Sequence, residues 1–269
     1  MDTTIASPLL IDQNLPLDKL LCSASAADLA ALADIITDTG RGRVSLTDVT
    51  KEIILQKKRQ NSLYTIAPVL SAEICAFGGN TVMNVFRQKK SLAYNVVALD
   101  VAKRLGAKVG KAAEIVEIER EIIKKILTNS LKNIKEDEVG ALLDINKLNV
   151  DREQVNRLLR QGKTEDAASL LIHSCGPYAV SRMLNASQPT ALNMVVKAGL
   201  PVFGKAIASR APVLLNPVAA VISTAWMTYE LSGPAYRVTV PAVIRVASIR
   251  LANIQLQTDQ FRSELTKCL

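Results

Sequence analysis

The sequence has little of what catalytic and metal sites need. It holds one histidine, His173, and its four cysteines (Cys22, Cys75, Cys175 and Cys268) are too far apart for metal-ligand or redox spacing. One histidine leaves little from which to assemble a Ser–His–Asp set, and zinc requires three or four clustered ligands. We interpret His173 as a structural residue. We predict no catalytic residue, no metal site, no cofactor and no small-molecule substrate, and we expect that the protein is not an enzyme.

Aromatic residues are also scarce, at 4% of the chain, whereas hydrophobic residues make up 49% and charged residues 22%. The core must therefore consist mostly of Leu, Ile, Val and Ala, which favours close helix packing over a large β-sandwich. The sequence predicts an all-α protein built as a multi-helix bundle.

Acidic residues nearly vanish beyond Gln188. From Ala191 onward there are eight cations and only three carboxylates, which accounts for five of the eight net positive charges of the whole chain. This shift predicts two parts: residues 1–188 as an N-terminal and central helical bundle, and residues 189–269 as a C-terminal hydrophobic, basic helical module. Apolar and basic composition together is typical of elements that lie on a membrane surface, and it also fits a buried core with a solvated rim.

The start of the chain lacks the basic residues and the long apolar run of a secretory signal. We expect a cytoplasmic protein, with association at the inner membrane left open.

Helical periodicity recurs through the first two thirds of the chain. Ser25 is placed to cap a second helix within Leu17–Thr37, and Thr39–Arg43 predicts a turn. The expected helices are Leu17–Thr37, Asp48–Lys58, a helix beginning near Ala67, Leu92–Leu105, Lys111–Ile134, Glu136–Asn149, Glu153–Gln161 and Glu165–His173, the last capped by Thr164.

Two patterns resemble binding motifs without meeting their requirements. Glu114, Glu117, Glu119 and Glu121 lack the histidine partners of a carboxylate metal site, so we expect a charged helix face. The segment Phe77–Thr81 lacks the spaced glycines and lysine of a phosphate loop, so we expect a tight turn between helices.

The longest uncharged segment is Ala211–Tyr229, which lies between Arg210 and Glu230 and contains Pro212 and Pro217. A spanning helix needs about 20 apolar residues. Three readings stay open for this segment: burial in the protein core, shallow association with a membrane surface, and a true span.

The following segment, Ser232–Ala252, is read in two ways. Tyr236–Val240 alternates like a strand, although Pro241 argues against a central strand. Read as a helix, the segment has Pro241 in its first turn, and Arg245 and Arg250 flank the apolar face and reach outward.

We expect the C-terminal module to contact a protein partner, and the alternative surface is an anionic membrane. Nucleic acid is not expected, because aromatic residues are not interleaved with the basic ones. The predicted contact residues are Arg210, Val213, Leu214, Leu215, Val218, Val221, Ile222, Trp226, Tyr229, Tyr236, Arg237, Arg245 and Arg250.

Four blocks in order carry a family resemblance: Leu20–Ser23, Phe77–Asn80, Leu99–Leu105 and Ser232–Val243. With these blocks the chain resembles the YaaW family of uncharacterised bacterial proteins. Its central part is more faintly similar to the ubiquinol–cytochrome c chaperone family. The first resemblance implies no established activity, and the second implies helical proteins that assist the assembly of respiratory complexes.

The leading hypothesis is therefore a non-enzymatic bacterial protein that binds a partner protein at the inner membrane surface. The alternatives are an assembly chaperone for a membrane or respiratory protein, which requires an apolar groove in the central bundle, and a membrane-active toxin or defence effector that inserts an apolar hairpin formed around Val213–Tyr229.

Overall fold

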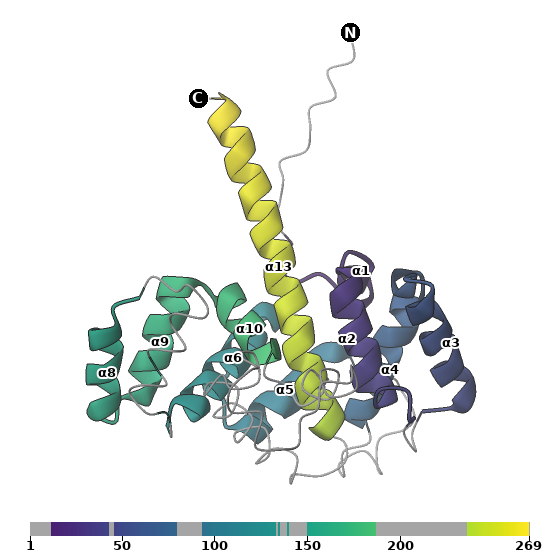
Figure 1. Cartoon of the computed structure of the whole chain (residues 1–269), viewed down its shortest axis with the longest axis horizontal. Coiled ribbons are helices and arrows are strands. Elements are labelled where there is room, and N and C mark those ends of the chain that lie inside the picture. Colours follow the sequence, from purple (N-terminus) through teal and green to yellow (C-terminus); the bar gives the residue numbers. More distant parts are fainter. Residues whose placement is uncertain are drawn as a thin grey trace, which may run out of the picture.

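The computed structural model describes residues 12–42, 46–79, 93–132, 134, 139, 150–186 and 236–268. These residues form ten α-helices and one 3-10 helix, with no β-strand among them (Figure 1). The predicted all-α fold is therefore confirmed.

The first helices are α1 (Leu17–Cys22), α2 (Ala26–Thr37), α3 (Asp48–Arg59), the 3-10 helix η1 (Leu63–Ile66) and α4 (Ala67–Gly79). Among them, α2 begins at the side-chain cap that the sequence predicts, and α3 also begins at a side-chain cap. The Ser25 hydroxyl accepts from the backbone N–H of Asp28, and the Thr47 hydroxyl accepts from that of Thr50. Each cap satisfies a backbone donor that has no partner within its helix, which fixes where α2 and α3 begin.

The end of α4 differs from the prediction. Phe77, Gly78 and Gly79 form the last turn of the helix rather than an interhelical turn. A Cβ atom on Gly78 would lie 2.5 Å from Cγ2 of Val97 in α5 (Tyr94–Leu105), so the glycine allows the two helices to approach closely. Asn80 and Thr81 lie outside the described residues.

Three further helices follow α6 (Ile115–Leu131): α8 (Arg152–Arg160), α9 (Thr164–Cys175) and α10 (Pro177–Ala186). The predicted cap at Thr164 is wrong, because Thr164 is the first helical residue and Lys163 precedes it without a side-chain cap. Gly176 separates α9 from α10 at φ 82°, and Pro177 begins the next helix, where a missing N–H costs nothing.

The last described helix, α13 (Tyr236–Cys268), is the centre of the bundle. It has 33 residues and is about 50 Å long. It packs against α10, α2, α6, α4, α5 and α1, so nearly every side chain from Val238 to Leu251 is buried. The strand reading of Tyr236–Val240 is wrong, and Pro241 is the sixth residue of the helix rather than part of its first turn.

Several predictions lie outside the described residues. They are the boundary near residue 188, the helix over Glu136–Asn149 except for Val139, and the uncharged segment Ala211–Tyr229. The one described helix of the predicted C-terminal module, α13, is packed within the first bundle. None of the described helices combines the length and the apolar character needed to cross a bilayer.

Candidate interaction surfaces

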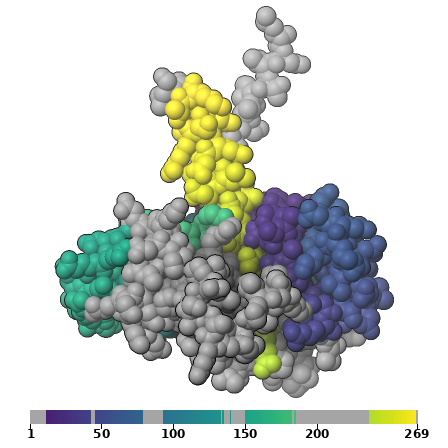
Figure 2. All heavy atoms as spheres, in the orientation of Figure 1, coloured from purple at the N-terminus to yellow at the C-terminus, as the bar shows by residue number. Residues whose placement is uncertain are grey.

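The large hydrophobic side chains that remain exposed in the described residues belong to two parts of the structure. Three belong to α3 and η1: Val49, Ile53 and Tyr64. The other three, Leu256, Phe261 and Leu265, belong to the outer part of α13, residues 254–268, which we call the arm. Figures 1 and 2 show the arm standing clear of the other described helices.

The first surface, which we call the α3 face, consists of Val49, Ile53, Gln56 and Gln60 with Tyr64 beyond the helix end. Val49 is 71% exposed and Ile53 39% exposed, and a spacing of four residues places both on one side of α3. Ile54, on the other side, is fully buried in the core. The helix is therefore anchored by one side and presents apolar side chains on the other.

Charged groups of both signs border the α3 face. Two lysines of the helix already have partners: Lys51 Nζ lies 2.8 Å from Asp48 Oδ1, and Lys58 Nζ lies 2.6 Å from Asp34. Lys57 and Arg59 add positive charge to the last turn, where it opposes the negative end of the helix dipole. Mixed charge around apolar side chains is better matched by the surface of a partner protein than by a uniformly anionic membrane surface.

The second surface is the apolar seam of the arm. Ile254, Thr258, Phe261 and Leu265 follow one another at spacings of four, three and four residues, so they share one side of the helix. Phe261 is 42% exposed and Leu265 is 47% exposed, and Ile254 at the base is half-buried. Leu256 points to the opposite side and is 60% exposed. The seam continues the buried side of α13 beyond the end of the bundle.

A buried ion pair fixes the inner half of α13. The Arg250 Nε donates to Glu119 Oε2 on α6 at 2.8 Å, and both side chains are at most 2% exposed. The second Glu119 oxygen accepts from the Tyr94 hydroxyl on α5 at 2.9 Å. Arg250 Nη1 donates to the carbonyls of Leu15 at 2.8 Å and Gln13 at 3.3 Å. One guanidinium thus ties α13 to α6 and to the segment before α1.

Burial has the largest effect on the pKa values of the acidic side chains in and around this network. It raises the pKa of Glu119 above its usual 4.5, because loss of solvent opposes ionisation more strongly than Arg250 and the Tyr94 hydroxyl favour it. The pKa of Tyr94 is well above its ordinary value, first because of burial and then because of the neighbouring Glu119 carboxylate. Burial also raises the pKa of Cys75 to about 11, so its thiol is not a ready nucleophile.

The described contact residues of the prediction are mostly engaged inside the bundle. Arg250 does not reach outward as expected, because it is 1% exposed and paired with Glu119. Arg245 Nη1 lies 3.3 Å from Asp28 Oδ1 on α2, with little of either side chain exposed. The guanidinium of Arg104 lies 5.3 Å from the ring centre of the half-buried Tyr236. Of the four predicted contact residues described, only Arg237 is classed as exposed.

The remaining predicted contacts have no described position. These are Arg210, Val213, Leu214, Leu215, Val218, Val221, Ile222, Trp226 and Tyr229.

The predicted charged face of α6 is correct for three of its four glutamates. The exposed Glu114 and Glu117 form a capping box at the helix start, and Glu121 lies at the rim of a hollow. Glu119 is the exception, since it is buried against Arg250. No set of three or more His, Cys, Asp or Glu side chains in the described residues could hold a metal ion, and His173 is exposed on α9.

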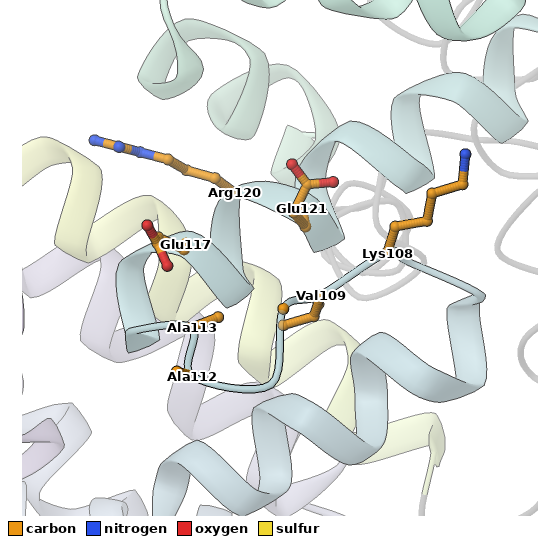
Figure 3. Close-up of a pocket in the computed structure, with 8 residues that line it drawn as sticks. Lys108, Val109, Ala112, Ala113, Glu117, Arg120 and Glu121 are labelled. Carbon is orange, nitrogen blue, oxygen red and sulfur yellow. The ribbon is translucent and has the colours of Figure 1, made fainter.

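An open hollow of about 490 Å³ lies where the loop after α5 meets α6. Its charged lining residues are Lys108, Glu117, Arg120 and Glu121. Figure 3 shows Lys108 and Arg120 pointing away from one another, so their charges do not converge on one ligand position. Lys108 instead lies 3.7 Å from Glu165 of α9. The hollow therefore offers no organised cofactor site.

Two features of these surfaces were not predicted, although each has a sequence signal. Glu119 falls within the apolar stripe of α6, four residues after Ile115 and three before Ile122, which marks it as a buried acid. Arg250 falls in the same way within the largely apolar segment Val246–Ala252. The seam of the arm is visible as the spacing of Ile254, Phe261 and Leu265.

Comparison with known proteins gives relatives over most of the chain. It is 25% identical over 243 residues to a UPF0174 protein of Helicobacter pylori strain J99, which covers 90% of this chain and 93% of the relative. It is 28% identical over 230 residues to the UPF0174 protein YaaW of Escherichia coli K12, which covers 84% of this chain and 90% of the relative. No family model and no solved structure matches the chain. The fainter similarity to the chaperone family stays a prediction. The predicted resemblance to the YaaW family is therefore confirmed: along most of its length the chain is similar to UPF0174 proteins, among them YaaW.

Proposed function

We propose that this chain is a non-enzymatic protein that binds a partner protein through the α3 face, at the inner face of the bacterial membrane. The observation that supports the proposal is that Val49 and Ile53 are both exposed on one side of α3, whereas Ile54 on its other side is buried. Apolar side chains grouped on one helix face and bordered by polar ones are typical of interaction sites.

The α3 face suits a partner that offers an apolar groove or helix. Val49 and Ile53 are presented at helical spacing from a helix whose other side is fixed in the core, so binding orders little of this chain. Complete burial of a Val or Ile side chain contributes about 1.5–3 kcal/mol, and partly exposed side chains contribute less. Gln56 and Gln60 extend the face with side chains that can both donate and accept hydrogen bonds.

The membrane part of the proposal is supported by charge. The chain carries a net charge of +8, and Lys57 and Arg59 lie in the last turn of α3. A basic side chain near an anionic lipid surface contributes about 1 kcal/mol. Asp48 and Glu52 lie on the same helix and oppose direct contact with lipid. We therefore assign the α3 face to a protein, and lipid attraction to the basic chain as a whole.

The two alternative functions gain no support from the described residues. A chaperone role predicts an apolar groove in the central bundle, whereas half of the residues that line the hollow beside α6 are charged. A membrane-active toxin depends on Ala211–Tyr229, which lies outside the described residues.

The test is photo-crosslinking in bacterial cells with the full chain, followed by separation of membranes. A photoreactive residue at Val49 is expected to capture one defined protein, whereas the same residue at Glu153, exposed on α8, is not. Ile53→Glu is expected to abolish the adduct, and Leu256→Glu, which adds the same charge to the arm, to leave it intact. An adduct that persists in Ile53→Glu, or that forms equally from Glu153, contradicts the α3 face.

The membrane part has a separate readout. We expect the wild-type chain to sediment with membranes and to be released by carbonate. Recovery entirely in the soluble fraction would contradict association with the membrane and leave the protein partner to be judged by crosslinking.

A further inference from the structure

We propose that the arm of α13 pairs with the arm of a second copy of this chain. The two arms run antiparallel, with Ile254 of one copy beside Leu265 of the other and Thr258 beside Phe261. This inference concerns the arm alone and does not depend on the partner proposed for the α3 face.

The seam supplies the surface that the pairing buries. Ile254, Thr258, Phe261 and Leu265 have the alternating four- and three-residue spacing of helices that pack side by side. The same side of α13 is in the core at Ala247 and Leu251, which are 0% and 3% exposed. Beyond the bundle, Phe261 and Leu265 remain 42% and 47% exposed, so the seam continues where the surrounding helices have stopped.

The position of α13 excludes a parallel pair. Paired helices lie about 8–10 Å apart, which is also the distance at which the neighbouring helices of the bundle surround α13. Consecutive residues from Val246 to Leu251 are buried, so α13 is enclosed on all sides where it leaves the bundle. Two parallel arms at that separation would force the two bundles into the same space. The arm leaves the bundle at one end (Figure 1), so antiparallel arms would place the two bundles at opposite ends of the pair.

Charge then selects the register. Arg262 borders one side of the seam and Glu264 the other. When Ile254 lies beside Leu265 of the second copy, Arg262 and Gln255 of that copy are separated by about 3 Å along the helix axis. Glu264 and Gln257 of that copy are separated by the same axial distance. Glutamine can donate to a carboxylate and accept from a guanidinium.

An alternative register, in which the second arm slides seven residues away from the first bundle, is unfavourable. It places Phe261 beside Leu265 and brings Arg262 next to Arg262 of the second copy, and Glu264 next to its own equivalent. Two like-charge contacts oppose that register and none opposes the proposed one. In the proposed register the arm therefore matches a second copy of itself in the spacing of its seam, and it brings no like charges together.

The pair is expected to be weak. Four seam residues from each arm bury less than the roughly 1,200 Å² of a stable interface, so association should depend on protein concentration. Sedimentation velocity over a concentration series is expected to show a reversible monomer–dimer equilibrium.

The orientation is tested by mixing two cysteine variants of the full chain. Both carry Cys22→Ser and Cys268→Ser, which removes the exposed Cys22 and the cysteine near the arm tip. One adds Ile254→Cys and the other Leu265→Cys. Antiparallel pairing predicts a disulfide-linked dimer in the oxidised mixture and none in either variant alone. Dimers from each variant alone would show parallel arms, and no dimer in the mixture would show that the seam does not meet a second copy; either result overturns the proposal.

A second measurement separates the seam from the rest of the arm. Phe261→Glu is expected to weaken dimerisation about tenfold or more, because a carboxylate replaces a buried ring. Leu256→Glu adds the same charge on the opposite side and is expected to leave the equilibrium unchanged. Both residues are exposed in the monomer, so neither variant should unfold. Equal effects of the two variants would overturn the seam as the interface. We expect crosslinking from Val49 to be unaffected by either substitution, which keeps this test separate from the proposed function.

Discussion

The inner and outer halves of α13 belong to one helix but are stabilised in different ways. From Val238 to Leu251 the helix is held by burial on all sides and by the Arg250–Glu119 ion pair. From Gln255 to Lys267 most of its side chains are exposed. Isolated helices of about 12–15 residues are only marginally stable in water, so the arm depends on the inner half for its nucleus. The bundle thus provides a preformed helix end that a binding partner can stabilise further.

The two halves also reverse the usual placement of residue types. The inner half buries an arginine, and the arm exposes a phenylalanine. The buried charge is tolerated because Glu119 and two backbone carbonyls accept hydrogen bonds from the guanidinium. The exposed part of Phe261, 42% of the residue, is not covered in the monomer, which is why we place it in an interface.

The largest expected effect comes from removing the buried cation. Arg250→Met leaves Glu119 buried without its cation, and we expect it to lower the free energy of unfolding by about 3–5 kcal/mol. Urea denaturation measures this value. The matched change in the arm, Arg262→Met, should fall within about 0.5 kcal/mol of wild type, because Arg262 is exposed.

A double variant sharpens this result. Glu119→Gln keeps an acceptor for the Tyr94 hydroxyl and removes the buried charge, so combining it with Arg250→Met should recover part of the loss. An Arg250→Met variant as stable as Arg262→Met would show that the ion pair does not hold the inner half.

A second comparison uses apolar truncations in the two halves. Ile244 is fully buried, and Ile244→Ala should cost about 2–5 kcal/mol through lost contacts and a cavity. Leu256 is 60% exposed, and Leu256→Ala should change the free energy of unfolding by no more than about 0.5 kcal/mol. A large loss in Leu256→Ala would mean that the arm packs against the chain in solution, and the distinction between the halves would fail.

Much of the bundle follows from local sequence signals. The caps at Ser25 and Thr47 and the start of α4 at Ala67 follow from side chains that act within one turn. Such signals carry their full physical cause in neighbouring residues, so they can be found without knowledge of the fold.

The ion pair could not be predicted in the same way. Glu119 and Arg250 are 131 residues apart, and the choice of partner depends on how α6 meets α13. The interruption of two apolar stripes by charged residues marks each as unusual, but only tertiary packing joins them. Pro241 shows the converse case, because its local preference for a helix start is overridden by a helix that begins five residues earlier.

The smallest effect is expected in the dependence of stability on pH. Because burial raises the pKa of Glu119 in the folded state, the folded chain binds its proton more tightly than the unfolded chain. The contribution of Glu119 to stability is therefore fully present below the unfolded pKa of about 4.5 and declines as pH rises from there through the folded pKa. One proton limits this slope to about 1.4 kcal/mol per pH unit.

The difference between wild type and Glu119→Gln isolates this contribution from the other carboxylates. Urea denaturation from pH 4 upward should show wild-type stability falling relative to Glu119→Gln just above about pH 4.5 and levelling at higher pH. Glu264→Gln, on the exposed arm, serves as the matched substitution. A wild-type stability that instead rises relative to Glu119→Gln over this window would mean that Arg250 outweighs burial. The inner half would then be held more by charge pairing than by exclusion of water, because an ion pair that favours the carboxylate lowers its folded pKa.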